Sequence, residues 1–276
     1  MPGDICEELA RVAPRLGSLG RRLHYFAAAT STNDIAARLA DLGAEEGTTV
    51  VADGQTAGRG RQGRVWFSPP GAGLYVSIIL RPGAGLVGAA GGRAAPSVTS
   101  LLTIASGVAV AEGVRTSTGL SAEVKWPNDL MIGHRKLAGI LAEASANGPV
   151  LQHVVLGVGI NLRPAAYPPE LSDAATSIEA EIDRRADRAP ILAETLAALA
   201  RRYGDLQAGR FDAILTAWRA LSPSVRWSLV EWDTPEGVVR GRTEDIDEDG
   251  ALIVRVGRNV QRLMAGEVRW IRTMGD

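Results

Sequence analysis

The segment from residue 58 to residue 64 concentrates the residue types that bind anions. It holds three glycines and three arginines in the order Gly58, Arg59, Gly60, Arg61, Gln62, Gly63 and Arg64. Glycine lets the backbone come close to a ligand, and the arginine fork matches carboxylate and phosphate oxygens. Because no Asp or Glu lies between Asp53 and Glu112, no sequence neighbour neutralises these arginines. The pattern predicts a mobile anion clamp. Local composition leaves two alternatives, a solvated basic loop and a loop that binds nucleic acid.

A second set of polar residues flanks a Trp-Pro dipeptide. Lys125 ends an apolar strand-like run, and a lysine held there, partly out of water, attracts an anion strongly. Asn128 and Asp129 are either turn residues of a hairpin or groups that contact a phosphate or a metal. Lys136 lies on the returning strand, from which it can reach a phosphate. The spacing of the set, more than any one member, makes it a candidate site.

Two shorter strings complete the candidate residues. Ser31, Thr32 and Asn33 precede an apolar-periodic run, so they are candidates for a helix cap or for side chains that read a small polar ligand. Gly157 and Gly159 interrupt an apolar strand-like run that ends at Asn161. Small residues in a strand often mark the close approach of a ligand or of another backbone.

Motifs of several other site types are missing from the sequence. No G-x-x-x-x-G-K-[ST] string occurs, and Gly157-Val158-Gly159 does not continue to a third glycine at the dinucleotide-binding spacing, so neither a P-loop nor a Rossmann site is supported. Three histidines and one cysteine, without an H-E-x-x-H string, make a zinc site improbable. No G-x-S-x-G nucleophile elbow occurs either.

Composition limits the classes of partner. The chain has 276 residues, 46% of them hydrophobic and 22% charged, with a net charge of −1. This balance predicts no general attraction to nucleic acid or to anionic membranes. The sequence lacks an uninterrupted apolar run of about 18 residues, so no membrane span is expected, and its first residues lack the pattern of a secretory signal. The single cysteine, Cys6, cannot form an internal disulfide, which favours a reducing cytoplasm.

The apolar pattern predicts an α+β chain in two parts. Helices are expected over 6–19, 35–42, 97–118, 189–209 and 211–220. Strands are expected over 23–29, 48–53, 74–81, 123–126, 130–132, 137–144 and 150–161. After Pro223, short strands over 225–232, 237–246, 252–256, 260–263 and 267–271 predict a small β-barrel. We place the boundary within 221–224, which gives domains 1–222 and 223–276. The segment 82–96, rich in glycine and alanine, is expected to be a loop without an assigned function.

The candidate strings, taken together and in order, resemble the biotin–protein ligase family. The matching strings are Ser31-Thr32-Asn33, Gln55-Thr56-Ala57-Gly58-Arg59-Gly60-Arg61, Gly63-Arg64 with Trp66, Lys125-Trp126-Pro127-Asn128-Asp129, Lys136-Leu137-Ala138-Gly139-Ile140-Leu141, and Gly157-Val158-Gly159-Ile160-Asn161-Leu162. Each string alone is weak, but their order and spacing make chance a poor explanation.

The resemblance implies a fold and a reaction. The fold is α+β, with a central mixed β-sheet like that of class II synthetases and a C-terminal SH3-like barrel. The reaction joins biotin to ATP with Mg²⁺, giving biotinyl-5'-AMP and pyrophosphate, without a redox cofactor. The biotinyl group then passes to a lysine of a partner, the biotin carboxyl carrier protein domain of an acyl-CoA carboxylase.

Residue roles follow from the match to the family motifs. The catalytic cations would be Lys125, Arg59 and Arg61. The biotin-binding residues would be Ser31, Thr32, Asn33, Gln55, Arg59, Gly60, Arg61, Lys125, Gly139, Gly157 and Gly159. The ATP-binding residues would be Arg61, Arg64, Trp66, Asn128, Lys136 and Asn161. Magnesium would be held through the phosphates, with Asn128 as a candidate ligand.

The chain departs from the branch of the family that represses transcription. Only residues 1–22 precede the first expected strand, too few for a helix-turn-helix, so we expect no repressor activity and no nucleic-acid or membrane partner. The protein is expected to be a monomer or a weak homodimer. Two other functions stay open: a lipoate or octanoate ligase or transferase of the same superfamily, whose Arg-Arg…His-Asp motif is not found here, and a noncatalytic nucleic-acid-binding module.

Overall fold

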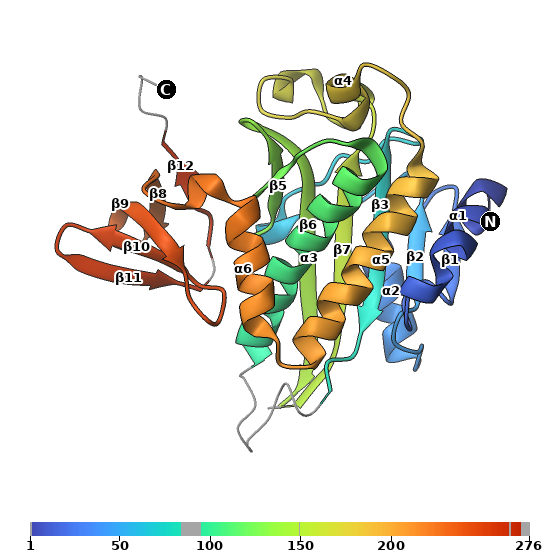
Figure 1. The fold of residues 1–276 in the computed structure, drawn as a ribbon, viewed down its shortest axis with the longest axis horizontal. Coiled ribbons are helices and arrows are strands. Elements are labelled where there is room, and N and C mark those ends of the chain that lie inside the picture. Colours follow the sequence, from blue (N-terminus) through green and yellow to red (C-terminus); the bar gives the residue numbers. More distant parts are fainter. Residues whose placement is uncertain (1, 84–94, 149, 265, 272–276) are drawn as a thin grey trace.

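A computed structural model describes residues 2–83, 95–148, 150–264 and 266–271. Most of the segment 82–96, expected to be a loop, lies outside these residues. The chain forms a large helix-covered sheet and a smaller C-terminal sheet beside it (Figure 1). The predicted α+β class with a mixed central sheet is confirmed.

The large sheet has seven strands in the order β1-β2-β3-β7-β6-β5-β4. Their bounds are β1 Leu23–Phe26, β2 Thr49–Ala52, β3 Gly73–Leu80, β4 Glu123–Lys125, β5 Asp129–Ile132, β6 Arg135–Asn147 and β7 Val150–Asn161. The pair β1–β2 is parallel and every other neighbouring pair is antiparallel. The longest strands, β6 and β7, pair with each other, and β7 also pairs with β3. These three strands form the centre of the sheet.

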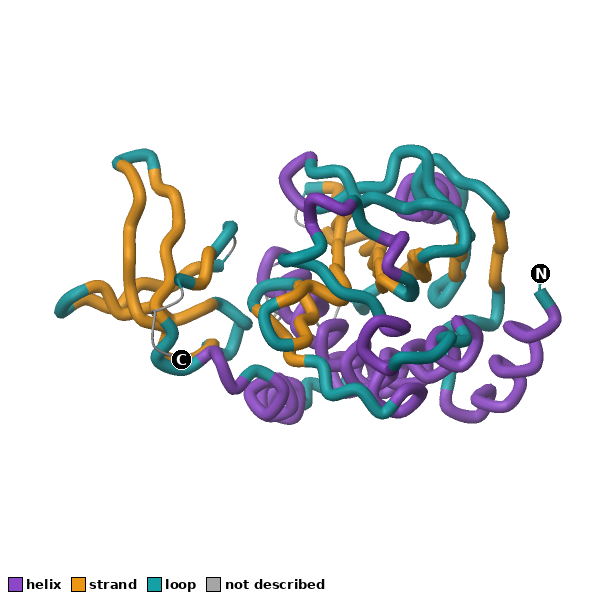
Figure 2. The backbone as a smooth tube through the Cα atoms, turned by 90° about the horizontal axis from the view of Figure 1, so that it is seen from above, coloured by secondary structure: helices purple, strands orange, loops and turns teal. Residues whose placement is uncertain are grey.

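Helices cover the large sheet unequally. Their bounds are α1 Gly3–Val12, α2 Thr32–Asp41, α3 Ala95–Thr118, α4 Ile178–Ile182, α5 Arg188–Gln207 and α6 Phe211–Leu221. The helices α3 and α5 pack on one face and on each other, with α1 against α5 and α6 against α3. On the other face, α2 covers only a small apolar cluster that includes Ala36, Ile79 and Val155. Seen from above, helices line one side of the sheet and loops gather on the other (Figure 2).

Strand alternation decides which residues face the uncovered side. Successive side chains of a strand point to opposite faces. In β7, Val154, Leu156, Val158 and Ile160 join the main core under α3 and α5. Gly157, Gly159 and Asn161 have the opposite parity, as does Val155, which packs under α2. The glycine string therefore lies on the side that α3 and α5 leave free.

Helix α3 is the one described helix that is long and apolar enough to span a membrane, with a mean hydropathy of 1.5 over 18 residues within Ser97–Thr118. In this structure 72% of its most apolar 18-residue stretch is buried, because α5, α6 and β6 pack around the helix. Its apolar character is therefore accounted for by its place in the core.

The C-terminal sheet has five antiparallel strands in the order β11-β10-β9-β8-β12. Their bounds are β8 Leu229–Thr234, β9 Gly237–Ile246, β10 Leu252–Val256, β11 Asn259–Leu263 and β12 Arg269–Trp270. Side-chain contacts fasten this sheet to the first part of the chain. Trp126 Nε1 donates to Gly250 O at 3.0 Å, and Arg219 Nε pairs with Asp245 at 2.7 Å.

Several element boundaries differ from the prediction. The first helix spans Gly3–Val12 and passes into a 3-10 turn over Ala13–Arg15, because Pro14 cannot continue an α-helix. The strand expected from residue 225 starts at Leu229, since Pro223–Val225 form a 3-10 turn. Residues 163–182, for which no element was predicted, form two 3-10 turns and helix α4.

Candidate active site

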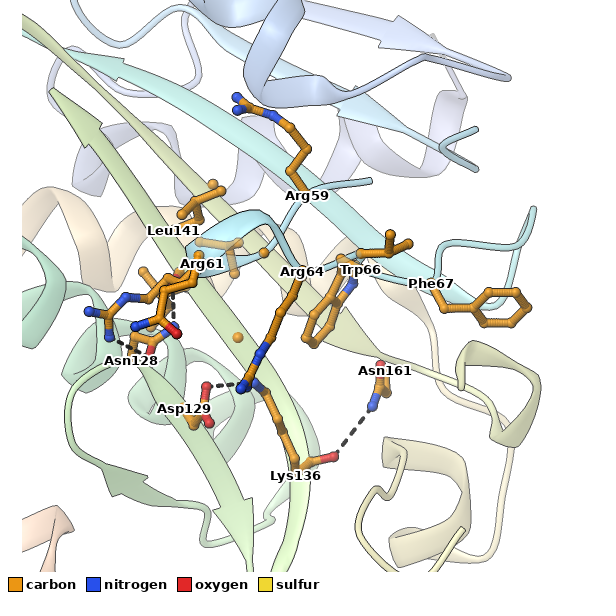
Figure 3. A pocket seen from close by; sticks show the side chains of 18 of the residues that line it. Arg59, Arg61, Arg64, Trp66, Phe67, Asn128, Asp129, Lys136, Leu141 and Asn161 are labelled. Atoms are coloured by element: carbon orange, nitrogen blue, oxygen red, sulfur yellow. Dashed lines mark hydrogen bonds and ion pairs between the residues drawn. The ribbon is translucent and has the colours of Figure 1, made fainter. Parts of the chain in front are cut away.

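A cavity of about 480 Å³ opens on the face of the large sheet opposite α3 and α5. This volume is in the range of small-molecule sites. Every residue predicted for the site lines it: Ser31, Thr32, Asn33, Gln55, Arg59, Gly60, Arg61, Arg64, Trp66, Lys125, Asn128, Lys136, Gly139, Gly157, Gly159 and Asn161. The fold thus brings strings from the whole first part of the chain to one place (Figure 3).

Glycines of β6 and β7 make the floor of this cavity. A Cβ atom at Gly157 would lie 2.2 Å from Asn33 Oδ1, and one at Gly159 would lie 2.6 Å from Trp66 Nε1. A Cβ at Gly139 would come within 2.9 Å of the same indole ring. The glycines are therefore needed so that Asn33 and Trp66 can lie against the sheet.

One end of the cavity is a buried hydrogen-bonded cluster around the start of α2. The backbone N–H of Thr32 donates to Gln55 Oε1 at 2.8 Å. Ser77 Oγ lies 2.8 Å from Thr32 Oγ1 and 2.6 Å from Asn33 Oδ1. Ser31 is the N-cap residue of α2, yet its side chain makes no capping hydrogen bond. Ser31, Thr32 and Asn33 were predicted either to cap a helix or to bind a small polar ligand. Ser31 occupies the cap position, and all three residues line the cavity.

The glycine/arginine segment forms a tight hairpin beside the floor. Gly60 N donates to Arg64 O at 2.7 Å, and Trp66 N donates to Gly58 O at 2.9 Å. At the tip, Gln62 has a φ of 56°, in the left-handed region that few non-glycine residues adopt. The hairpin aims its three arginines in different directions.

Two of these arginines pair with acids that are distant in sequence. Arg59 Nη2 lies 2.9 Å from Asp34 and 2.6 Å from Glu143. In Figure 3 it points away from the rest of the cluster. Arg64 pairs with Glu267 of the C-terminal part. The sequence correctly showed no neutralising neighbour along the chain, but the fold supplies neutralising carboxylates from α2, β6 and the C-terminal part.

Lys125 and Arg61 are both partly withdrawn from water. Burial lowers the pKa of Lys125, and the carboxylate of Asp129 opposes that change. Burial likewise lowers the pKa of Arg61, whose guanidinium donates to Asn128 Oδ1 at 3.1 Å. Lys125 Nζ also lies 4.9 Å from the ring centre of Trp270. Charges in such surroundings act more strongly on an anion than charges in water do.

Lys136 and Asn161 also line the cavity. Lys136 Nζ pairs with Asp129 at 2.6 Å and lies 5.3 Å from the ring centre of Trp66. Asn161 Nδ2 donates to Thr176 O at 2.9 Å and to Lys136 O at 3.3 Å. Its amide nitrogen thus holds the returning strand and the 163–182 segment together.

Several lining residues were missed by the sequence reasoning. They are Val65, Phe67, Ala166, Tyr167, Pro168, Leu171, Ala175, Gly266, Glu267 and Val268. The polar cluster also includes Ser77 and Glu143, which were not predicted. Strand alternation could have found these two residues. Ser77 pairs with Gly157 across β3 and β7, and Glu143 lies four residues after Gly139 on β6, so each points to the same face of the sheet as that glycine.

No group of three or more metal-binding side chains occurs among the described residues. Oxygen atoms suited to a hard cation line the cavity at Asn128, Asp129 and Glu267. Asn128 Nδ2 donates to Ile140 O at 2.8 Å, which turns its Oδ1 away from that strand. This donor set fits a Mg²⁺ ion that takes most of its ligands from phosphates and water.

Comparison with known proteins agrees with this architecture. Residues 25–161 match the Biotin/lipoate A/B protein ligase family, and residues 230–269 match the Biotin protein ligase C terminal domain. The chain is 33% identical over 269 residues to the bifunctional ligase/repressor BirA of Bacillus subtilis, covering 97% of this chain and 79% of that protein. It is 35% identical over 266 residues to the biotin–[acetyl-CoA-carboxylase] ligase of Mycobacterium tuberculosis, covering 93% of this chain and 91% of that protein.

Solved structures give the same result. The biotin protein ligase from Aquifex aeolicus in complex with biotin and ATP superposes with a TM-score of 0.75 at 25% identity, over 92% of this chain and all of the other. Fold and cavity together define a protein ligase with a catalytic α+β domain followed by a ligase C-terminal domain. The chain belongs to the biotin protein ligase family and is an enzyme of that type.

Proposed function

We propose that this enzyme activates biotin with ATP and transfers it to one lysine of a biotin carboxyl carrier protein domain. The observation that carries the proposal is the cavity itself, in which Lys125 and Arg61 lie close to a glycine floor and a buried polar end. A long, apolar ligand with a polar head and a carboxylate tail fits this order of groups. The relatives named above support biotin as that ligand.

In the first step a carboxylate oxygen of biotin attacks the α-phosphorus of ATP, and pyrophosphate leaves. Both reactants are anions, so their approach needs nearby positive charge. Lys125 and Arg61 supply it from partly dehydrated positions, and Arg59 supplies it once it is drawn from its acid partners. The product is the mixed anhydride biotinyl-5'-AMP.

In the second step a neutral lysine amine of the carrier attacks the acyl carbon of the anhydride. The carbon–nitrogen bond forms, AMP leaves with the bond electrons, and the amine loses a proton to solvent. No side-chain nucleophile is needed, because the substrates provide both nucleophiles. The hairpin at residues 58–64 lies over the cavity, and its closure on the intermediate would keep water away from the anhydride.

The remaining roles are those implied by the match to the family motifs, and the lining of one cavity by all these residues supports them. Ser31, Thr32, Asn33 and Gln55 contact the ureido head of biotin, while Gly60, Gly139, Gly157 and Gly159 give room for its ring and chain. Arg64, Trp66, Asn128, Lys136 and Asn161 serve ATP. Asn128 and Asp129 would hold Mg²⁺ together with the phosphates, and the ion would screen phosphate charge.

The setting of the enzyme is part of the proposal. The exposed lone thiol of Cys6 favours a reducing cytoplasm.

The direct test is incubation of the enzyme with biotin, ATP, Mg²⁺ and a carrier domain, followed by mass spectrometry. We expect a mass increase of one biotinyl group on a single lysine. The increase should disappear when ATP is omitted or when the target lysine of the carrier is changed to arginine. An unmodified carrier in the complete mixture would refute the proposal.

A lipoate or octanoate ligase shares the matched family, so specificity needs its own test. Thermal denaturation with biotin, lipoate or octanoate, each with ATP, separates the two readings. We expect biotin to raise the melting temperature and the two fatty acids to leave it unchanged. Stabilisation by lipoate alone would overturn the assignment of biotin.

A further inference from the structure

Glu143 has no role in the reaction described above, yet it touches two residues of the cavity. It lies on β6, two strand positions beyond Leu141 and on the same face of the sheet. Its carboxylate accepts a hydrogen bond from Asn33 Nδ2 at 2.7 Å and pairs with Arg59 at 2.6 Å. The carboxylate therefore joins the hairpin to the buried polar end.

The contact with Glu143 fixes the orientation of the Asn33 amide. A carboxylate accepts hydrogen bonds but donates none, while an amide has one donating and one accepting end. The nitrogen of Asn33 must therefore face Glu143, and its oxygen must face Ser77. Ser77 Oγ lies 2.6 Å from that oxygen and is fully buried. Its single hydrogen is consequently given to Asn33.

The same reasoning fixes the hydroxyl of Thr32. Its Oγ1 lies 2.8 Å from Ser77 Oγ and 3.1 Å from Gln55 Oε1. Since the hydrogen of Ser77 is already used, the hydrogen of Thr32 points to Ser77 or to Gln55. Gln55 is itself oriented, because its Nε2 donates to Ser68 Oγ at 2.9 Å. In both cases Thr32 Oγ1 can offer only lone pairs to a ligand.

We propose that Glu143 is a positioning residue that sets the direction of this hydrogen-bond relay, so that Thr32 accepts an N–H group of the ligand. This inference rests on the proposed function, in which that group is a ureido N–H of biotin. Without a carboxylate at position 143, Asn33 is free to turn its nitrogen toward Ser77. The hydrogen of Ser77 then turns to Thr32, whose own hydrogen can point into the cavity and oppose an N–H.

Packing supports a fixed place for Asn33. The missing side chain at Gly157 leaves the only room in which its amide can lie, since a Cβ atom there would be 2.2 Å from Asn33 Oδ1. Asn33 is 5% exposed and Thr32 is 4% exposed. Water therefore has little access to Asn33 and Thr32, so it cannot easily replace their hydrogen-bond partners.

Isothermal titration with biotin, and separately with ATP, tests the inference on the wild type and on Glu143→Gln. Glutamine keeps the shape but can donate, so it no longer dictates the orientation of Asn33. We expect biotin to bind about tenfold more weakly, a change equal to about 1.4 kcal/mol, and ATP to bind within about twofold of the wild type. Asp34→Asn is the matched control, because it removes the other carboxylate from Arg59 and leaves the relay intact. It should change biotin affinity by less than about twofold.

A second variant, Ser77→Ala, cuts the relay one residue further along. Ser77→Ala should also weaken the binding of biotin and leave the binding of ATP unchanged. The double variant Glu143→Gln/Ser77→Ala should bind biotin no more weakly than whichever single variant binds it less tightly, since both changes act through one path. Losses of biotin-binding free energy that add up in the double variant would overturn the relay. A loss of biotin affinity in Asp34→Asn equal to that in Glu143→Gln would also overturn it. Biotin affinity within about twofold of wild type in Glu143→Gln would overturn it too. Failure of the wild type to bind biotin would instead refute the proposed function.

Discussion

At the scale of single residues, Lys125 has the clearest electrostatic setting in the cavity. We expect Lys125→Ala to reduce pyrophosphate release in the presence of biotin and ATP by about 100-fold or more, as for other groups that stabilise a developing anion. Lys125→Arg keeps a cation at the site and should recover part of the rate. Release near the wild-type rate in Lys125→Ala would remove this residue from the mechanism.

The pH dependence follows from the same residue. Burial lowers the pKa of Lys125, so its ammonium loses the proton at a lower pH than an exposed lysine does. The rate of adenylation should therefore decline on the alkaline side as the cation is lost. Since arginine stays protonated throughout that range, the decline should be displaced to higher pH in Lys125→Arg. Identical alkaline limbs in both enzymes would assign the decline to another group.

At the scale of elements, Glu194 of α5 clamps the N-terminal helix to the core. It accepts hydrogen bonds from Arg15 at 2.8 and 2.9 Å and from Arg11 at 2.7 Å. These bonds, first those of Arg15, lower the pKa of Glu194, while its burial opposes the change. A carboxyl group whose pKa is lowered by folding stabilises the fold above its unfolded pKa, and this stability is lost as the pH falls through the folded value.

We therefore expect Glu194→Gln to lower the free energy of unfolding by about 1–3 kcal/mol at neutral pH. The difference from the wild type should shrink as the solution is acidified, in thermal melts followed by circular dichroism. Glu7→Gln, at an exposed position of α1, is the control and should have almost no effect. A difference that does not change with pH would mean that the loss comes from packing.

The helices and strands also show which parts of the fold and of the site could be predicted from the sequence. Periodicity placed several strands well, since β7, β9 and β10 have the predicted bounds. The strings that resemble the family motifs contain all the residues predicted for the site, and these residues line one cavity. Local patterns could not show which acids face the arginines, because Asp34, Glu143 and Glu267 are far from them in sequence. The lining of Tyr167 and Leu171 was also missed. Leu171 lies in a 3-10 turn and Tyr167 directly follows another, and such short turns have no strong apolar period.

At the scale of the whole molecule, residues 266–268, just before β12 of the C-terminal sheet, supply part of the cavity wall. Trp270 of β12 lies against Lys125, and Glu267 pairs with Arg64. We expect Trp270→Ala to slow pyrophosphate release about fivefold, because the ammonium loses a contact worth about 1 kcal/mol. Trp227→Ala, an exposed tryptophan of the same part of the chain, should leave the rate unchanged. Equal effects of both changes would argue against a specific contact. The division at residues 222 and 223 stays a prediction.

The acid partners of the hairpin arginines also determine how the protein responds to dissolved ions. Arg59 already has Asp34 and Glu143 as counter-ions, and Arg64 has Glu267. An entering anion therefore exchanges with carboxylates that belong to the chain, and little net charge is gained in the exchange. Salt screens bare charge most strongly, so affinity for an anionic ligand should depend only weakly on ionic strength. Binding of an anion in the cavity would then be an exchange of ion pairs, in which the ligand replaces carboxylates of the protein as the partners of the arginines.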